Sequence, residues 1–176
     1  MKKIKLAIIS FSILGLFACG KSDGFKDEAE RKFMNERGFK TKALLNDYLN
    51  ATPENKVKIS AHNLALKTTP ERAMDCLTTA GVVTNYMNGL SSSTPETVQM
   101  GVIYVNTWDL VLQDMIKENK TKEADALSAI AEMAQTKVNK FQNGDDAYKL
   151  EKVAAFNKCK DESMPYFAVK VISSYK

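Results

Sequence analysis

Several signatures of catalytic and membrane-spanning proteins are missing from this sequence. Histidine occurs once, as His62, which excludes any metal site built from two or more histidines. There is no Gly-x-Ser-x-Gly nucleophile motif, no His-Glu-x-x-His zinc motif and no glycine-rich phosphate loop. The uncharged run from residue 6 to 17 is mostly apolar but only 12 residues long, whereas a spanning helix needs roughly 20. We therefore predict a protein that is not an enzyme and needs no cofactor or metal.

Long blocks of one charge are also missing. The 25 Lys and Arg outnumber the 21 Asp and Glu, a formal charge of +4. Three of these cations, Lys2, Lys3 and Lys5, precede the apolar run, and the chain from Cys19 onward has 22 basic and 21 acidic residues. The two signs alternate along that chain, and a nucleic-acid site needs a concentrated basic face. We expect no nucleic-acid partner, and the charge pattern gives no electrostatic sign that the domain itself has a second contact with a membrane.

The N-terminus has the order of a bacterial export signal. Three lysines are followed by the apolar run, the small Ala18, Cys19 and the polar segment 20–24. Leu16-Phe17-Ala18-Cys19 resembles the lipobox of bacterial lipoproteins, although Phe17 is bulkier than usual at its position. The resemblance implies cleavage between Ala18 and Cys19 and a diacylglycerol on the Cys19 thiol, with acyl chains that hold the protein on a membrane. An ordinary secretory signal cut near Ala18, or an uncleaved apolar anchor, are the alternatives.

The same resemblance divides the chain and gives it a location. Residues 1–18 are expected to be a cleaved signal peptide, 19–24 a lipidated tether, and 25–176 a helical periplasmic domain. In lipoproteins of Gram-negative bacteria, Asp after the modified cysteine favours the inner membrane, and here that position is Gly20. The expected location is the outer membrane, with the membrane contacted through the lipid on Cys19.

Two cysteines remain once Cys19 is set aside as the lipid site. Cys76 and Cys159 allow one pairing, across 83 positions of sequence, and an exported domain lies in a compartment where disulfides persist. We predict a disulfide between them, with two buried free thiols as the alternative.

Three Thr-Pro-Glu triplets are the clearest internal signal. They start at Thr52, Thr69 and Thr94 and contain three of the four prolines. Thr can cap a helix, Pro fits its first position, and Glu complements its positive end. Apolar residues at helical spacing follow each triplet, so we predict three helix starts.

Periodicity elsewhere extends this helical pattern over most of the chain. Helices are predicted at 26–37, 43–49, 57–64, 73–90, 98–116 and 121–142, then from Asp145 through Cys159, and from Pro165 to about Ser173. Leu44, Val57, Leu127 and Leu150 are expected on inward faces. The hydrophobic segment 98–116 is expected to be the central helix, with a partial strand as the alternative because of Val102, Ile103 and Val105. The prediction is an all-α, up-and-down single helical bundle of six to eight helices.

Few side chains are candidates for chemistry. His62 lies between apolar residues and is expected to be structural. Asp145-Asp146 and Asp161-Glu162 are neighbours on a helix and do not face each other. Asp109 and Asp114 would need the fold to bring them together. The methionines Met87, Met100, Met115 and Met133 are expected to fill the core, with an adaptable binding groove as the alternative.

These observations favour a non-enzymatic envelope lipoprotein whose helical domain binds a protein partner. The arrangement of Cys76-Leu77 in one helix and Cys159 near the C-terminus is similar to the immunity proteins of type VI amidase effectors. That resemblance implies an alternative function, neutralising a cell-wall hydrolase or a toxin. An enzyme is the third hypothesis, and it requires a deep pocket with converging carboxylates.

Overall fold

The computed structural model describes residues 23–167, which are all-α. The predicted lipid site with its cleavage point, Ala18 and Cys19, and the predicted helix beyond residue 167 lie outside that range. Between residues 23 and 167 there are seven helices and no strands: α1 Glu28–Glu36, α2 Lys42–Asn50, α3 Pro53–Ala65, α4 Pro70–Asn88, α5 Pro95–Lys117, α6 Glu123–Asn143 and α7 Asp146–Phe167. The all-α prediction is confirmed, and segment 98–116 is helical throughout.

The Thr-Pro-Glu triplets begin α3, α4 and α5. In each, the threonine hydroxyl accepts a hydrogen bond from the amide three residues on, at 3.3 Å, and the proline takes a first-turn position. A hydroxyl at this position satisfies one of the amides that a helix start leaves unpaired. Asp145 similarly accepts from the amide of Tyr148 at 2.9 Å where α7 begins. The predicted caps are therefore confirmed.

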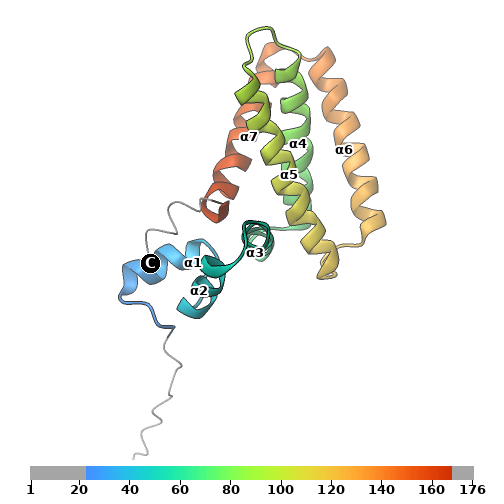
Figure 1. The fold of residues 1–176 in the computed structure, drawn as a ribbon. Coiled ribbons are helices and arrows are strands. Elements are labelled where there is room, and N and C mark those ends of the chain that lie inside the picture. The colour runs from blue at the N-terminus through green and yellow to red at the C-terminus, as the bar shows by residue number, and fades with distance from the viewer. Residues whose placement is uncertain (1–22, 168–176) are drawn as a thin grey trace, which may run out of the picture.

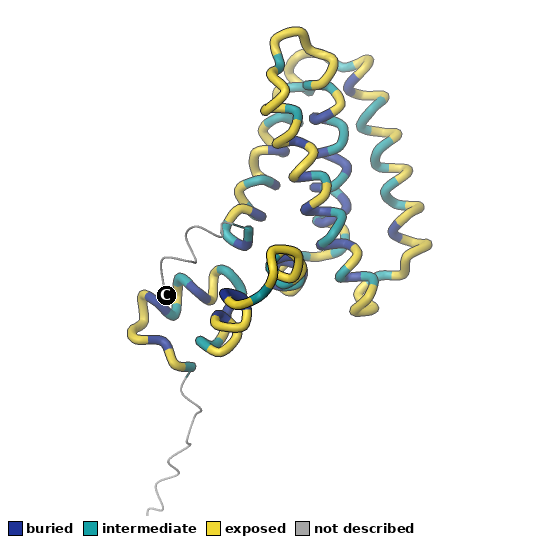
Figure 2. Tube along the Cα trace, in the orientation of Figure 1, coloured by how far each residue is buried: buried dark blue, intermediate teal, exposed yellow. Residues whose placement is uncertain are grey.

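Helix α4 lies at the centre of an up-and-down body formed by α4, α5, α6 and α7. It packs against the other three, whereas α3 packs on α5 and α7 and α2 packs on α3 (Figure 1). The prediction that 98–116 is the central helix is wrong. Helix α5 is more apolar, but Met100, Val102 and Ile103 on its outer side are each about half exposed. Figure 2 shows exposed and buried positions alternating along the helices of the body. Composition alone does not reveal how many neighbours surround a helix.

The buried side chains form three clusters. The largest surrounds Trp108, which is fully buried, and joins α3, α4, α5, α6 and α7. A second, at the far end of the body, contains Val83, Tyr104, Phe141 and Phe156. The third lies in an N-terminal lobe made of the residues before α1, α1 and α2, with Ile59 of α3 packed against it, and consists of Phe25, Met34, Phe39, Leu45, Tyr48 and Leu49. Helix α3 thus contributes side chains to both the lobe and the body.

Small and hydroxyl-bearing residues let α5 approach α4 closely. A Cβ placed on Gly101 would overlap the side chain of Thr84, lying 2.8 Å from its Cγ2. Thr78, Thr79 and Thr84 are all buried on α4, and the hydroxyl of Thr78 donates to the carbonyl of Met74 at 2.8 Å. Small side chains at Gly101 and Thr84 therefore allow the close contact between α4 and α5.

Several expected inward residues face solvent instead. Leu44, Val57, Leu127 and Leu150 are 49%, 40%, 59% and 70% exposed. The buried positions on these four helices are others, such as Leu45 on α2, Leu64 on α3, Ala126 on α6 and Phe156 on α7.

The last part of the described chain differs from the prediction as well. Helix α7 runs without a break through Pro165 to Phe167, so Pro165 does not start a separate helix. The proline lies in the last turn, where its missing amide removes only one helical hydrogen bond. No helix between residues 23 and 167 is long and apolar enough to cross a membrane.

Candidate functional site

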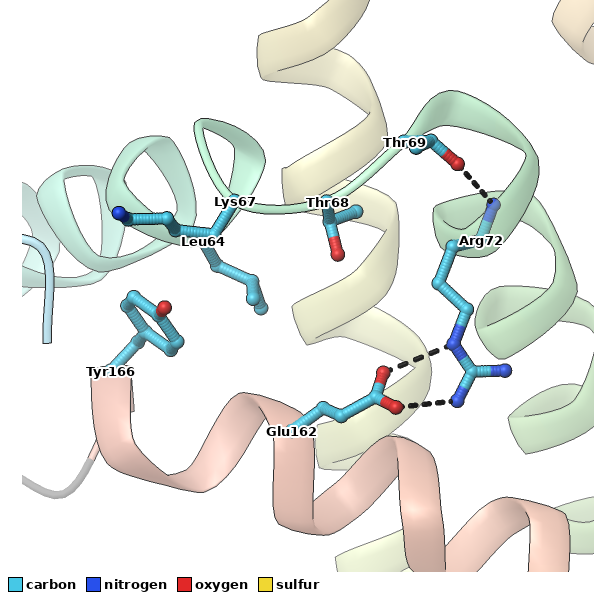
Figure 3. Close-up of a pocket in the computed structure, with 7 residues that line it drawn as sticks. All are labelled: Leu64, Lys67, Thr68, Thr69, Arg72, Glu162 and Tyr166. Carbon is cyan, nitrogen blue, oxygen red and sulfur yellow. Dashed lines mark hydrogen bonds and ion pairs between the residues drawn. The ribbon is translucent and has the colours of Figure 1, made fainter. Parts of the chain in front are cut away.

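A groove runs along the junction between the N-terminal lobe and the body. It consists of two open pockets that share Lys67 and Tyr166. The first, of about 350 Å³, is lined by Leu64, Lys67, Thr68, Thr69, Arg72, Glu162 and Tyr166. Figure 3 shows Glu162 and Tyr166 on α7 opposite Arg72, Leu64 and Lys67. The second, of about 520 Å³, continues toward α1 and is lined by Glu28, Lys32, Asn35, Glu36, Lys67 and Tyr166.

The connection between α3 and α4 positions one wall of this groove. Leu66 ends α3, and Thr69 caps α4 by accepting from the amide of Arg72. The cap fixes the first turn of α4 and with it the starting point of the Arg72 side chain. The short linker between them exposes Lys67, which has no ion-pair partner among residues 23–167.

Arg72 joins the two walls. Its Nε and Nη2 donate to the two carboxylate oxygens of Glu162 on α7 at 3.0 and 2.8 Å, and its Nη1 donates to Asp75 at 2.9 Å. The hydrogen bonds that Arg72 donates to Glu162 raise the pKa of Arg72 above its ordinary value. A bidentate pair of this kind fixes orientation as well as charge, so the groove wall is rigid at this point.

The charged network continues into the body through Asp75. Lys137 of α6 is mostly buried, and its Nζ donates to the carbonyl and carboxylate of Asp75 at 2.9 and 2.7 Å and to the hydroxyls of Thr78 and Thr79 at 2.6 and 2.8 Å. Burial lowers the pKa of Lys137. Burial acts to raise the pKa of Asp75, but the hydrogen bond and charge of Lys137 outweigh it and hold that pKa below its ordinary value.

Cys76 and Cys159 lie on the same two helices as Arg72 and Glu162. Cys76 is one turn after Arg72 on α4, and Cys159 is one turn before Glu162 on α7. Their sulfurs are 2.11 Å apart, their Cα atoms are 5.5 Å apart, and both side chains are buried. The structure thus brings the predicted pair to bonding distance, between α4 and the last described helix.

Tyr166 forms the floor between the two pockets. It is 8% exposed, and burial raises the pKa of its phenol. Its carbonyl accepts from the hydroxyl of Ser60 on α3 at 2.6 Å, which ties the end of α7 to the helix shared by lobe and body. The groove therefore presents a buried aromatic ring, paired charges, threonine hydroxyls and an ammonium without an ion-pair partner among residues 23–167, a set suited to recognition.

The other candidates from the sequence are not gathered in this groove. His62 Nδ1 lies 2.9 Å from Asp114 Oδ2 and links α3 to α5, while Asp109 accepts from Gln113 at 2.6 Å. The two aspartates therefore have different partners. Met115 is fully buried, Met87 and Met133 pack against the core, and Met100 is half exposed. Within residues 23–167 no group of three or more His, Cys, Asp or Glu is arranged to hold a metal ion.

The residues that define the groove had little signal in the sequence. Arg72 and Glu162 are 90 positions apart, and Lys67 and Tyr166 lie in segments without a motif. Only the second Thr-Pro-Glu triplet, with its cap at Thr69, pointed to this region. Comparison with protein-family models, curated proteins and solved structures found no match to this chain.

Proposed function

We propose that this protein is a lipid-anchored lipoprotein of the outer membrane whose periplasmic helical domain binds a protein partner through the groove at Lys67 and Tyr166. The sequence order of lysines, apolar run, Ala18 and Cys19 supports the anchor, and Gly20 supports the outer-membrane location. In this proposal the domain acts by binding and carries out no reaction.

The open shape and chemistry of the groove carry the proposal. Small-molecule sites are concave enough to bury most of their ligand, whereas these two pockets are open to solvent along the junction of two packed units. Arginine and tyrosine are enriched at protein interfaces, and here Arg72 and Tyr166 are held in place by Glu162 and Ser60. Two cations without ion-pair partners among residues 23–167, Lys32 and Lys67, favour a partner segment that presents carboxylates.

We further propose that Cys76 and Cys159 form a disulfide in the mature protein. The geometry permits it and the envelope is an oxidising compartment. A bond here joins α4 to α7 one turn from the Arg72–Glu162 pair, so it keeps the groove walls together when the partner is absent. A preformed groove loses less conformational entropy on binding than one that must be assembled.

Site-specific photo-crosslinking in intact cells tests the binding proposal. A photoreactive amino acid replaces Lys67 or Lys32 in the groove, or Lys140 on the outer side of α6 as the control. We expect one adduct of defined mass from positions 67 and 32 and none from position 140. A cell-wall hydrolase or toxin in that adduct would make the protein an inhibitor, and an envelope-assembly protein would make it a scaffold.

Two outcomes would contradict binding at the groove. One is the absence of any intermolecular adduct at positions 67 and 32, and the other is the same adduct at all three positions. A crosslink from position 67 to residues 168–176 of the same chain would show that the groove is filled by the C-terminal segment, which also overturns the proposal.

The anchor is tested separately. The Cys19→Ala variant should accumulate as an unprocessed precursor without incorporated acyl chains, because the lipid acceptor is lost. Lys21→Ala serves as the matched control and should mature normally. Normal cleavage and membrane retention of Cys19→Ala would refute the lipoprotein assignment.

A further inference from the structure

The outer face of α5 combines exposed apolar side chains with a long uncharged stretch. The 12 consecutive residues 97–108 carry no charge, and among them Met100, Val102 and Ile103 are each about half exposed. Helix α5 packs mainly on α4 and α3, and nothing in the described part of the chain covers these three side chains fully. A contiguous exposed apolar surface marks an interaction site in many proteins.

A row of side chains follows the middle of this face from one end of α5 to the other. Its spacing alternates between three and four positions, which keeps the row on one side of a helix. We call this row the outer stripe: Glu96, Gln99, Ile103, Asn106, Leu110, Gln113 and Lys117. All are exposed except Leu110, which is partly buried against the largest core cluster. At 1.5 Å for each residue the stripe is about 32 Å long.

The outer stripe is chemically symmetric about Asn106. One aliphatic side chain stands on each side of this asparagine, and one glutamine stands beyond each aliphatic residue. The two ends differ only in the sign of their charge, since Glu96 is acidic and Lys117 is basic. A stripe with this order is complementary to a second copy of itself that runs in the opposite direction.

The charges at the two ends of the stripe are available to such a partner. Neither Glu96 nor Lys117 has an ion-pair partner among residues 23–167. The two carboxylates that flank the stripe are engaged within the chain: Asp109 accepts from Gln113 at 2.6 Å, and Asp114 lies 2.9 Å from Nδ1 of His62. The middle of the face therefore offers apolar and amide groups, with opposite charges at its ends.

We propose that two copies of this protein pair through the outer stripes of their α5 helices, which run antiparallel about a two-fold axis at Asn106. This arrangement places Glu96 of each copy opposite Lys117 of the other. It also places Ile103 opposite Leu110, and Asn106 opposite itself. A parallel pair would bring like charges together at both ends of the stripe.

The pairing has the features of a symmetric interface. In a two-fold dimer the same surface serves both partners, so it must be complementary to itself. An asparagine within an apolar contact favours the register in which it meets a polar partner, here its own copy. The groove at Lys67 and Tyr166 contains no residue of α5, so the dimer and the proposed binding function stand or fail independently.

Cysteine crosslinking of the full chain in intact cells tests the pairing and its direction. After treatment with a short bis-maleimide, Asn106→Cys should give a species with the mass of two chains, whereas Thr136→Cys, exposed on α6, should give none. Glu96→Cys and Lys117→Cys should each give no dimer alone, but a dimer when the two are produced together with different tags. The inference is overturned by the absence of a dimer from Asn106→Cys, by an equal yield from Thr136→Cys, or by a dimer of two Glu96→Cys chains.

Charge reversal with rescue separates the interface from an effect on folding. In the Asn106→Cys chain, expressed at a level where the dimer is the minor species, Glu96→Lys should lower the crosslinked fraction about tenfold, because two ion pairs become two repulsions. Glu96→Lys/Lys117→Glu restores both pairs and should return the fraction to within twofold of the starting value.

Glu71→Lys is the matched control for this reversal. Glu71 is exposed and has the same place in the Thr-Pro-Glu triplet of α4 that Glu96 has in the triplet of α5, so both substitutions put a lysine in the first turn of a helix. Glu71→Lys should leave the crosslinked fraction unchanged. An equal fall with Glu71→Lys, or no recovery in Glu96→Lys/Lys117→Glu, would refute the antiparallel dimer.

Discussion

The N-terminal lobe and the four-helix body reach stability by different means. The lobe has two helices of 9 residues each, too short to be stable alone, and they depend on an aromatic cluster in which Phe39 and Tyr48 meet edge to face at 5.1 Å. The body has helices of 19 to 23 residues, a cysteine pair at bonding distance and a charged network through Asp75. Local unfolding of the lobe should therefore cost less free energy than unfolding of the body.

The largest expected effect tests whether the two cores are separate. Trp108→Ala removes the fully buried centre of the body and should lower the free energy of unfolding by about 4 kcal/mol. Phe39→Ala should leave the body intact and remove hydrogen-exchange protection only from residues 25–50. Hydrogen exchange measured by mass spectrometry distinguishes the effects of the two substitutions on the lobe and on the body. If Phe39→Ala removes protection equally from α4, the lobe and body unfold as one unit and the comparison fails.

The cysteine pair gives the next largest effect. If it is bonded, Cys76→Ser/Cys159→Ser should cost on the order of 4 kcal/mol, because the unfolded chain regains the freedom of a loop of 83 positions. Denaturant unfolding with and without reductant measures this loss of stability. Reductant should leave the free energy of unfolding of the double variant unchanged. Two free thiols per chain in unfolded, unreduced protein would contradict the bond. Protection in the lobe should change less than protection in α7.

Lys137 tests how far the charged network stabilises the body. Lys137→Met keeps most of the aliphatic stem but removes the ammonium whose three N–H donors are shared among four oxygens on α4. We expect a loss of about 2 kcal/mol, in the range for hydrogen bonds to a charged group. Lys140→Met, on the exposed side of the same helix, is the matched control and should change stability by less than about 0.5 kcal/mol. Equal effects from both substitutions would indicate that helix propensity, not the network, is being measured.

The smallest expected loss of stability comes from removing the same capping hydroxyl in the lobe and in the body. Thr41→Ala and Thr94→Ala each remove a hydroxyl that caps a helix at 3.3 Å, in the lobe and the body respectively. Each should cost about 1 kcal/mol. Because α2 has only two turns, Thr41→Ala should increase exchange throughout α2, whereas Thr94→Ala should affect only the first turn of α5. If Thr94→Ala increased hydrogen exchange equally along all of α5, the longer helix of the body would be no better stabilised by its neighbours than α2 is.

Local signals in the sequence predicted local structure well. The Thr-Pro-Glu triplets marked three helix starts because capping depends on residues within one turn. The count of cysteines predicted the contact of Cys76 with Cys159 because only one pairing was available once Cys19 was set aside.

Features that depend on neighbours were not predictable in the same way. Helix α4 is central although it contains buried threonines, because Thr78 bonds back to its own helix and also to Lys137. Leu150 appeared inward from its spacing, but α7 buries Phe156 and leaves Leu150 70% exposed. The groove combines Arg72 with Glu162 across 90 positions, and no periodicity within either segment connects them.

The position of the cysteine pair has a mechanical consequence. Tension applied at the N-terminal end of the described chain reaches residue 23 first, passes through the lobe and α3, and then meets Cys76. With the bond in place, the 83 positions between the sulfurs cannot lengthen. Extension before that point is limited to residues 23–76, about 180 Å of straight chain. The lobe, α3 and the first turns of α4 would then act as the extensible part of the molecule, while the segment from Cys76 to Cys159 keeps its length under load.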